Sequence, residues 1–277
     1  MNIFLTGATG FIGKKFLSLA LEKGHLIYAL SKKKQKFKHK NLKWLNGPIT
    51  KKWNDELKNS DVIVHLASEG VNNKNISYKR AKKFNVTDAL SFFKGAARNN
   101  CVKWVIAGSA SEYGNSCIGN VKIRVKTKPL PVSTYEKTKN MFSKKILLIS
   151  KKTKSKCRIM RIFPVYGEGE EKKRLYPSII KAALNKKDFY VNNGDQVRDF
   201  TNVNFVAKVL LDSCNFNKKK FTSYQIWHIS SGNPLSVKNF VKKIWKEYKA
   251  KGKLIFKKIE NKKYHNYVSD KKSIWKI

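Results

Sequence analysis

The chain contains little arginine, few acidic residues and no long apolar run. Seven of its 60 basic residues are arginines, and 18 residues are Asp or Glu, which gives a formal net charge of +42 over 277 residues. No apolar run reaches the ~18 residues that a membrane-spanning helix needs, and the N-terminus enters a strand-like segment without a charged leader. We therefore expect a soluble, cytoplasmic protein with no membrane segment.

Cysteines are also few, and their spacing is not that of a metal site. The chain has no C-x-x-C pair and no histidines accompanying its four cysteines, which are Cys101, Cys117, Cys157 and Cys214. Reduced cysteines that serve as ordinary core or surface residues are typical of cytoplasmic proteins. The sequence predicts no metal centre.

Lysine is spread along nearly the whole chain instead of being gathered in one block. Clusters such as 32–34 and 151–152 recur without an aromatic-rich basic stripe. A large positive charge is compatible with nucleic-acid or membrane binding, but a lysine bias of the whole composition explains a dispersed charge better. We expect no specific nucleic-acid partner and no membrane partner. Because arginine is rare, each arginine more strongly indicates a role for its flat, two-pronged donor.

A glycine-rich segment separates the first apolar run from the first helix-like run. Residues 2–5 predict a strand and residues 16–21 a helix, with Thr6-Gly7-Ala8-Thr9-Gly10-Phe11-Ile12-Gly13 between them. A helix N-terminus offers unpaired N–H groups and the positive end of the helix dipole, so a pyrophosphate can bind there, and glycine leaves room for it. The G-x-x-G-x-x-G spacing differs from the commoner G-x-G-x-x-G. We predict a dinucleotide site that includes Gly7, Thr9, Gly10, Phe11, Ile12 and Gly13.

Apolar runs alternate with helical patterns along the first half of the chain. Strands are predicted at 26–30, 42–45, 61–67, 103–107 and 158–163, and helices at 78–98 and 131–150. This rhythm predicts right-handed βαβ crossovers and an α/β fold with a doubly wound parallel sheet, the Rossmann fold. After residue 163 it loosens into helices at 174–184, 205–214 and 236–248, with a strand entry at 196–200. We predict a dinucleotide-binding domain at 1–163 and a small C-terminal α/β substrate lobe at 164–277, interleaved with it.

The end of the second predicted strand bears on the choice of cofactor. Ser31 and Lys32 stand where an acidic residue binds the adenosine ribose hydroxyls in NAD-dependent folds. A basic neighbourhood suits a 2′-phosphate instead. The sequence favours NADP(H), and NAD(H) stays open.

Three polar residues form a candidate group for proton transfer. Tyr135 and Lys139 are four residues apart and share a helix face, and Ser109 ends the fifth predicted strand. A phenol has an ordinary pKa of about 10, which a nearby ammonium lowers towards neutrality. Ser109 can hydrogen-bond a substrate oxygen while Tyr135 moves a proton. The Y-x-x-x-K spacing alone is weak evidence, and its position after the glycine turn and the serine makes it more specific.

These motifs resemble the extended short-chain dehydrogenase/reductase superfamily, in its branch of NAD(P)-dependent nucleotide-sugar epimerases, dehydratases and reductases. The resemblance covers nearly the whole chain through TGATGFIG, DVIVHLA, GSASEYG with YEKTK, RIFPVYGEGE, RLYPSIIKAAL and QVRDFTNVNFVA. It implies a catalytic triad of Ser109, Tyr135 and Lys139, in which Tyr135 and Lys139 also contact the cofactor. It further implies cofactor contacts at Leu66, Ala67 and Asn85, a homodimer, and substrate contacts at Ser109, Ser111, Arg174 and Arg198.

Departures from the family pattern narrow the expected reaction. Ala110 and Ser111 stand where 4,6-dehydratases have an Asp-Glu pair, so dehydration is not expected. No cysteine in GSASEYG matches the branch that epimerises at C3 and C5, although Cys117 lies close to it. GSASEYG, GEGE and RLYPSIIKAAL are most similar to CDP-abequose synthase-like 4-ketoreductases.

The sequence therefore predicts NADPH-dependent reduction of the C4 ketone of a nucleotide-linked 4-keto-6-deoxy or 3,6-dideoxy sugar, in the synthesis of surface-polysaccharide precursors. The first alternative is an NAD-dependent nucleotide-sugar 4-epimerase. A more distant one is a non-catalytic NADP-binding sensor or an RNA-associated protein, which the basic charge suggests.

Overall fold

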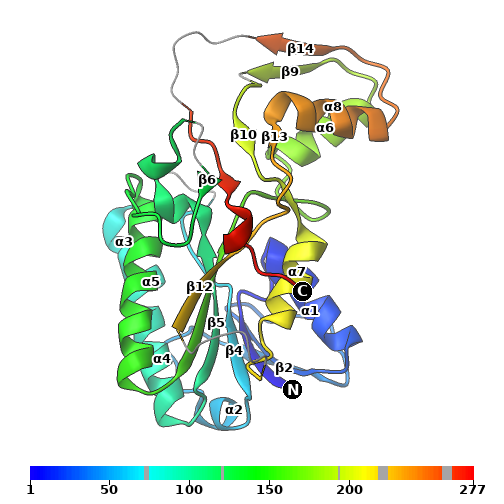
Figure 1. Ribbon diagram of the computed structural model, residues 1–277. Helices are drawn as coiled ribbons and strands as arrows, with labels where there is room; N and C mark the ends of the chain where they lie inside the picture. Colours follow the sequence, from blue (N-terminus) through cyan, green and yellow to red (C-terminus); the bar gives the residue numbers. More distant parts are fainter. Residues whose placement is uncertain (72–74, 120–121, 193, 218–223, 258–263) are drawn as a thin grey trace.

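A seven-stranded, all-parallel sheet forms the centre of the molecule (Figure 1). The computed structural model describes residues 1–71, 75–119, 122–192, 194–217, 224–257 and 264–277. The strand order is β12-β7-β5-β4-β1-β2-β3. The strands are β1 (Asn2–Thr6), β2 (Leu26–Ser31), β3 (Leu42–Asn46), β4 (Val62–His65), β5 (Lys103–Ser109), β7 (Lys156–Ile162) and β12 (Tyr224–Ile229). The predicted doubly wound Rossmann sheet is confirmed.

Helices cover both faces of this sheet (Figure 1). On one face α1 (Phe11–Glu22) packs against α7 (Val203–Asp212), and on the other lie α3 (Tyr78–Lys82), α4 (Ala89–Arg98) and α5 (Thr134–Lys152). The short α2 (Asn54–Lys58) contacts α4. Successive strand residues enter opposite cores, so Ile3 and Leu5 join the α1 side while Phe4 joins the α4 side. Burial on both faces explains why these strands are continuous apolar runs in the sequence.

The helix predicted over 78–98 forms as three consecutive segments. Between α3 and α4 the chain makes a π-helical turn, η1 (Lys83–Asp88). Its Asn85 side chain is buried. Such wide turns occur frequently at functional sites, and this one turns Asn85 towards the loop that follows β4.

A smaller lobe lies beyond the carboxyl ends of the strands, at the top of Figure 1. It contains α6 (Leu175–Leu184) and α8 (Val237–Glu247), the strand pair β9 (Phe189–Asn192) with β14 (Leu254–Lys257), and the pair β10 (Val197–Arg198) with β13 (Leu235–Ser236). A separate apolar core that includes Ile179, Phe240 and Val241 holds it together. Shorter elements are β6 (Lys122–Ile123), β8 (Val165–Tyr166), β11 (Thr201–Asn202), β15 (Val268–Ser269), η2 (Ala110–Tyr113), η3 (Asn115–Cys117) and η4 (Lys271–Ser273).

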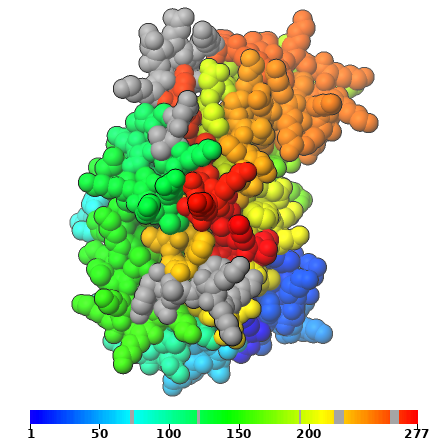
Figure 2. Space-filling view, viewed as in Figure 1, coloured from blue at the N-terminus to red at the C-terminus, as the bar shows by residue number. Residues whose placement is uncertain are grey.

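The chain after residue 163 contributes to the main sheet as well as to the lobe. β12, which the sequence did not predict, pairs in parallel with β7, and α7 packs on α1. The C-terminal segment, red in Figure 2, lies across the front of β12, where the Trp275 N–H donates to the His228 carbonyl at 2.9 Å. The boundaries 1–163 and 164–277 stay a prediction. Among the described residues, no helix is both long and apolar enough to span a bilayer.

Candidate active site

The glycine turn forms a backbone cradle at the start of α1. Gly7 has a φ of +75°, and a Cβ on it would lie 2.7 Å from backbone atoms of Leu66 and Ala67. A Cβ on Gly13 would collide with the Gly7 carbonyl. α1 begins with no side-chain cap and no acidic residue in its first turn, so its first N–H groups and positive dipole end are free to bind an anion. These residues fit the pyrophosphate of a dinucleotide.

The other residues of the turn and of the neighbouring loop surround this cradle. Thr9 and Gly10 are exposed, and Phe11 and Ile12 are half-buried. Leu66 and Ala67 are held beside the turn because their N–H groups donate to Thr6, to its carbonyl at 3.1 Å and to its hydroxyl at 3.3 Å. The predicted cofactor residues of the glycine turn, of α1 and of the β4 loop therefore lie together.

Replacing Gly13 with alanine is expected to weaken dinucleotide binding by at least about tenfold, because the added methyl group pushes the Gly7 carbonyl out of the cradle. Titration of NADPH and NADH by protein fluorescence measures this. The matched control is Gly95→Ala in α4, where a Cβ meets nothing within 4 Å. Equal affinities for Gly13→Ala and Gly95→Ala would contradict the assignment of the cradle.

The structure brings Ser109 and Tyr135 close together. Ser109 is the last residue of β5 and caps η2, where its hydroxyl accepts from the Ser111 N–H at 3.2 Å. Tyr135 lies in the first turn of α5, whose N-cap Ser133 forms a capping box with Glu136. The Ser109 and Ser68 hydroxyls lie close enough to the Tyr135 phenol for both to act to lower its pKa, and Ser68 belongs to the loop that follows β4. Its phenol thus reaches the carboxyl ends of β4 and β5.

Burial, together with the Glu112 charge, raises the pKa of Tyr135 to about 12, while the nearby Ser109 and Ser68 hydroxyls and the Arg174 charge act against this rise. The helical spacing of Tyr135 and Lys139 predicts that Lys139 lowers this pKa. Instead, the Lys139 ammonium donates to the Ala107 carbonyl at 2.6 Å, its side chain is almost fully buried, and burial lowers its own pKa. The phenol therefore carries its proton at neutral pH.

A buried ion pair, which no sequence pattern predicted, holds the backbone of Ser109 in place. Glu112 is fully buried; its Oε1 accepts from the Ser109 N–H at 2.9 Å and its Oε2 from Arg161 Nε at 3.1 Å. The Arg161 guanidinium also lies 4.4 Å from the centre of the Tyr113 ring. The Glu112 charge acts to raise the pKa of Lys139. The rarity of arginine was the only signal in the sequence that pointed to Arg161.

Two arginines of the lobe lie near this group. Arg174 precedes α6, and its Nε lies 3.6 Å from Glu170 Oε1. Its charge acts to lower the pKa of Tyr135 and of Arg198. Arg198 donates to Gln196 Oε1 at 2.7 Å, and its buried Nε has no protein partner among the described residues. The arrangement suits a diphosphate, which guanidinium groups bind with paired hydrogen bonds.

The C-terminal segment adds Tyr267, which the sequence analysis did not identify. Burial raises the pKa of Tyr267 to about 12, and the nearby Ser111 side chain acts against this rise. Its N–H donates to the Val197 carbonyl at 3.0 Å, which places it against β10 and Arg198. No local pattern signals this, because the contact joins segments far apart in the chain.

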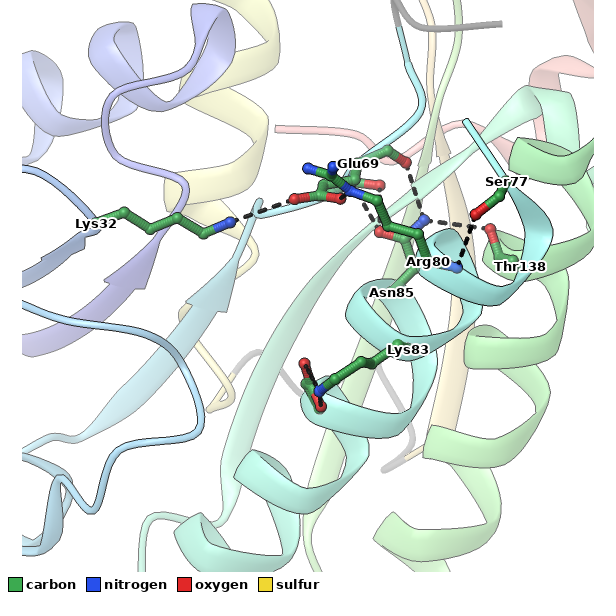
Figure 3. Close-up of polar contacts among 9 residues, drawn as sticks. Lys32, Glu69, Ser77, Arg80, Lys83, Asn85 and Thr138 are labelled. Carbon is green, nitrogen blue, oxygen red and sulfur yellow. Dashed lines mark hydrogen bonds and ion pairs between the residues drawn. The ribbon is translucent and has the colours of Figure 1, made fainter. Parts of the chain in front are cut away.

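At the predicted adenosine end, Ser31 and Lys32 both have protein partners. The Ser31 hydroxyl donates to the Lys33 carbonyl at 2.7 Å. Lys32 Nζ lies 3.3 Å from Glu69 Oε1 (Figure 3). The Asn85 amide is used inside the protein: it accepts from the Glu69 N–H at 2.8 Å and donates to the Glu69 carbonyl at 2.9 Å. Its predicted cofactor contact stays a prediction, and its visible role is to hold the β4 loop.

Two other candidate groups show no catalytic arrangement. Cys117 is buried, and burial raises the pKa of its thiol to about 12, so it is a poor proton carrier at neutral pH. His65 is also buried; its Nδ1 shares a 2.8 Å hydrogen bond with the Thr6 hydroxyl, and burial lowers its pKa to about 3. Within the described ranges, no three His, Cys, Asp or Glu side chains are gathered as metal ligands.

Comparisons with known proteins agree with this architecture. CDP-abequose synthase of Salmonella typhimurium is 26% identical over 250 residues, which cover 86% of this chain and 78% of that enzyme. Among solved structures, MoeE5 in complex with UDP-glucose and NAD superposes with a TM-score of 0.83 at 21% identity, covering 98% of this chain and 89% of MoeE5.

A UDP-N-acetylglucosamine 4-epimerase from Methanobrevibacter ruminantium M1, solved with UDP-N-acetylmuramic acid, superposes with a TM-score of 0.85 at 19% identity and covers 97% of this chain and 89% of that chain. The family model of the NAD dependent epimerase/dehydratase family matches residues 3–226. The chain is thus an enzyme of the NAD(P)-dependent extended short-chain dehydrogenase/reductase type and belongs to the NAD dependent epimerase/dehydratase family.

Proposed function

We propose that the protein reduces the C4 ketone of a nucleotide-linked 4-keto-6-deoxy or 3,6-dideoxy sugar with NADPH. The observation that carries the proposal is the position of the Tyr135 phenol close to Ser109 and packed against Gly70 of the β4 loop, whose residues Leu66 and Ala67 also line the cradle of α1. Net reduction of a ketone needs a hydride and a proton. A phenol that keeps its proton at neutral pH suits the second of these roles.

Each residue of the group has a distinct part in the proposed reaction. When bound, NADPH would supply the hydride to C4. Ser109 holds the substrate oxygen, and Tyr135 gives its proton to that oxygen as the negative charge develops, which leaves a C4 alcohol. Tyr135 then regains a proton from solvent. Lys139, buried one helical turn from Tyr135, would bind the ribose next to the nicotinamide through its ammonium group.

Arg174 and Arg198 hold the diphosphate of the substrate in this proposal. The Arg174 charge acts to lower the pKa of Arg198 and of Tyr135, which supports a place for both arginines at one site. Two similar proteins support a nucleotide sugar as the substrate class. They are CDP-abequose synthase and MoeE5, which was solved in complex with UDP-glucose and NAD. The positive charges of Lys32 and Arg80 at the adenosine end support NADPH.

A second candidate is an NAD-dependent nucleotide-sugar 4-epimerase. The Glu69 carboxylate beside Lys32 favours it, because a carboxylate suits the adenosine ribose hydroxyls of NAD. An epimerase of this kind retains its NAD through the catalytic cycle, whereas a reductase consumes NADPH once per turnover.

One experiment separates the two candidates. The protein is purified, its bound cofactor is extracted, and it is then mixed with NADPH and with keto-sugars generated in situ from CDP-, dTDP-, GDP- and UDP-linked hexoses. We expect an empty cofactor site and NADPH oxidation with at least one keto-sugar. Tightly held NAD together with no NADPH oxidation would favour the epimerase.

A further inference from the structure

The adenosine end of the site contains one carboxylate held between two cations (Figure 3). Glu69 Oε1 lies 3.3 Å from Lys32 Nζ, and Glu69 Oε2 accepts a hydrogen bond from Arg80 Nε at 3.0 Å. We propose that Glu69 controls the discrimination between NADPH and NADH, because it competes with the 2′-phosphate of NADPH for Lys32 and Arg80. This inference rests on the dinucleotide-binding part of the proposed function.

The position of this cluster in the fold connects it to the adenosine ribose. β2 and β4 are the two neighbours of β1, whose end leads into the glycine cradle. In this fold the residues at the end of the strand after the first helix bind the adenosine ribose. Lys32 directly follows that strand, β2, and Glu69 lies in the loop that follows β4. The Glu69 carboxylate therefore lies next to the expected place of the 2′-hydroxyl or 2′-phosphate.

The carboxylate is fixed more firmly than its partners. Asn85 holds the Glu69 backbone through two hydrogen bonds and donates a third, at 3.2 Å, to the Thr138 hydroxyl of α5. The Glu69 side chain is 20% exposed, whereas those of Lys32 and Arg80 are 63% and 71% exposed. The two cations can turn towards a phosphate, but the carboxylate stays. The Arg80 hydrogen bond and the Lys32 contact also lower the pKa of Glu69, which keeps it ionised at neutral pH.

A fixed carboxylate treats the two dinucleotides differently. The 2′-hydroxyl of NADH can donate a hydrogen bond to Glu69, whereas the 2′-phosphate of NADPH is repelled by it and must share both cations with it. The wild-type site therefore tolerates both dinucleotides, with a smaller preference for NADPH than two unpaired cations would give. Without the Glu69 charge, Lys32 and Arg80 are both available to the phosphate.

The test compares the Kd of NADPH with the Kd of NADH, both measured by fluorescence titration at low salt. We expect Glu69→Gln to increase the preference for NADPH by about tenfold, and this gain to shrink as salt screens the charges. We expect Lys32→Met to weaken NADPH binding by about tenfold and to change NADH binding by less than about twofold. NADPH and NADH differ only in one phosphate, so the ratio of their Kd values is insensitive to a general loss of folded protein.

The Lys83–Asp88 ion pair, on the next turns of the same helical stretch, supplies the matched control. Its lysine is 70% and its aspartate 17% exposed, close to the values of Lys32 and Glu69, so Asp88→Asn removes a comparable carboxylate away from the proposed ribose site. We expect Asp88→Asn to leave the ratio unchanged. If Glu69→Gln also leaves the ratio within twofold of wild type, the inference is overturned while the dinucleotide site stands. If wild-type protein binds neither dinucleotide, the inference falls together with the dinucleotide part of the proposed function.

Discussion

Replacing Tyr135 with phenylalanine lowers the turnover of a 4-keto nucleotide sugar by about 10²- to 10⁴-fold, because the substitution removes only the hydroxyl that supplies the proton. Dinucleotide affinity is expected to stay within about twofold, since the cradle of α1 is formed by backbone and not by this phenol. Initial rates of NADPH oxidation and fluorescence titration measure the two quantities separately.

Tyr190→Phe is the control for the tyrosine prediction. Tyr190 is an exposed tyrosine on β9 of the lobe, and it loses the same hydroxyl group away from the candidate active site. If Tyr135→Phe turns over the substrate as fast as the wild type, Tyr135 is not the proton donor. Loss of both turnover and dinucleotide binding would show instead that the ring position, rather than the proton, had been disturbed.

Replacing Glu112 with glutamine is expected to lower the free energy of unfolding by about 3–5 kcal/mol, because it leaves the buried Arg161 charge without a partner. The glutamine can still accept a hydrogen bond from the Ser109 N–H. The loss of stability therefore measures the broken ion pair with Arg161 more than the hydrogen bond that caps η2. Urea denaturation followed by tryptophan fluorescence measures it.

An exposed ion pair provides the control for the predicted loss of stability in Glu112→Gln. Glu247→Gln removes the same charge from the Lys243–Glu247 pair, in which both side chains are about half exposed, and is expected to cost no more than about 1 kcal/mol. Adding Arg161→Met to Glu112→Gln removes the uncompensated charge and should restore part of the stability. A loss below about 1 kcal/mol in Glu112→Gln would mean that solvent or another group compensates Arg161.

Local patterns were sufficient to predict that strands and helices alternate along the first half of the chain. A strand buried on both faces is a continuous apolar run, and a glycine turn between such a run and a helix has few other uses, so β1, the turn and α1 were predictable. The Ser133 cap of α5 and the shared face of Tyr135 and Lys139 also follow from spacing within one helix.

Contacts between distant segments could not be predicted in this way. Arg161 lies 49 residues from Glu112, and Lys32 lies 37 residues from Glu69. β12 was not predicted because its short run mixes polar and apolar residues. Its strand conformation depends on pairing with β7, which a local pattern does not show. The expectation that Lys139 sets the pKa of Tyr135 relied on helical spacing alone, whereas burial has the largest effect on this pKa, followed by the Ser109 hydroxyl at the end of β5.

The sequence by itself determined that this chain folds around a parallel sheet with a dinucleotide cradle at its first helix, and it indicated which phenol, ammonium and hydroxyl accompany that cradle, because these features depend on neighbours within one strand, turn or helix. Tertiary structure alone decided that Glu112 and Arg161 support Ser109, that Tyr267 returns to the site and that Glu69 holds Lys32 and Arg80. Charges and hydrogen bonds act over a few ångströms in space, and the chain brings such groups together only when its distant segments pack.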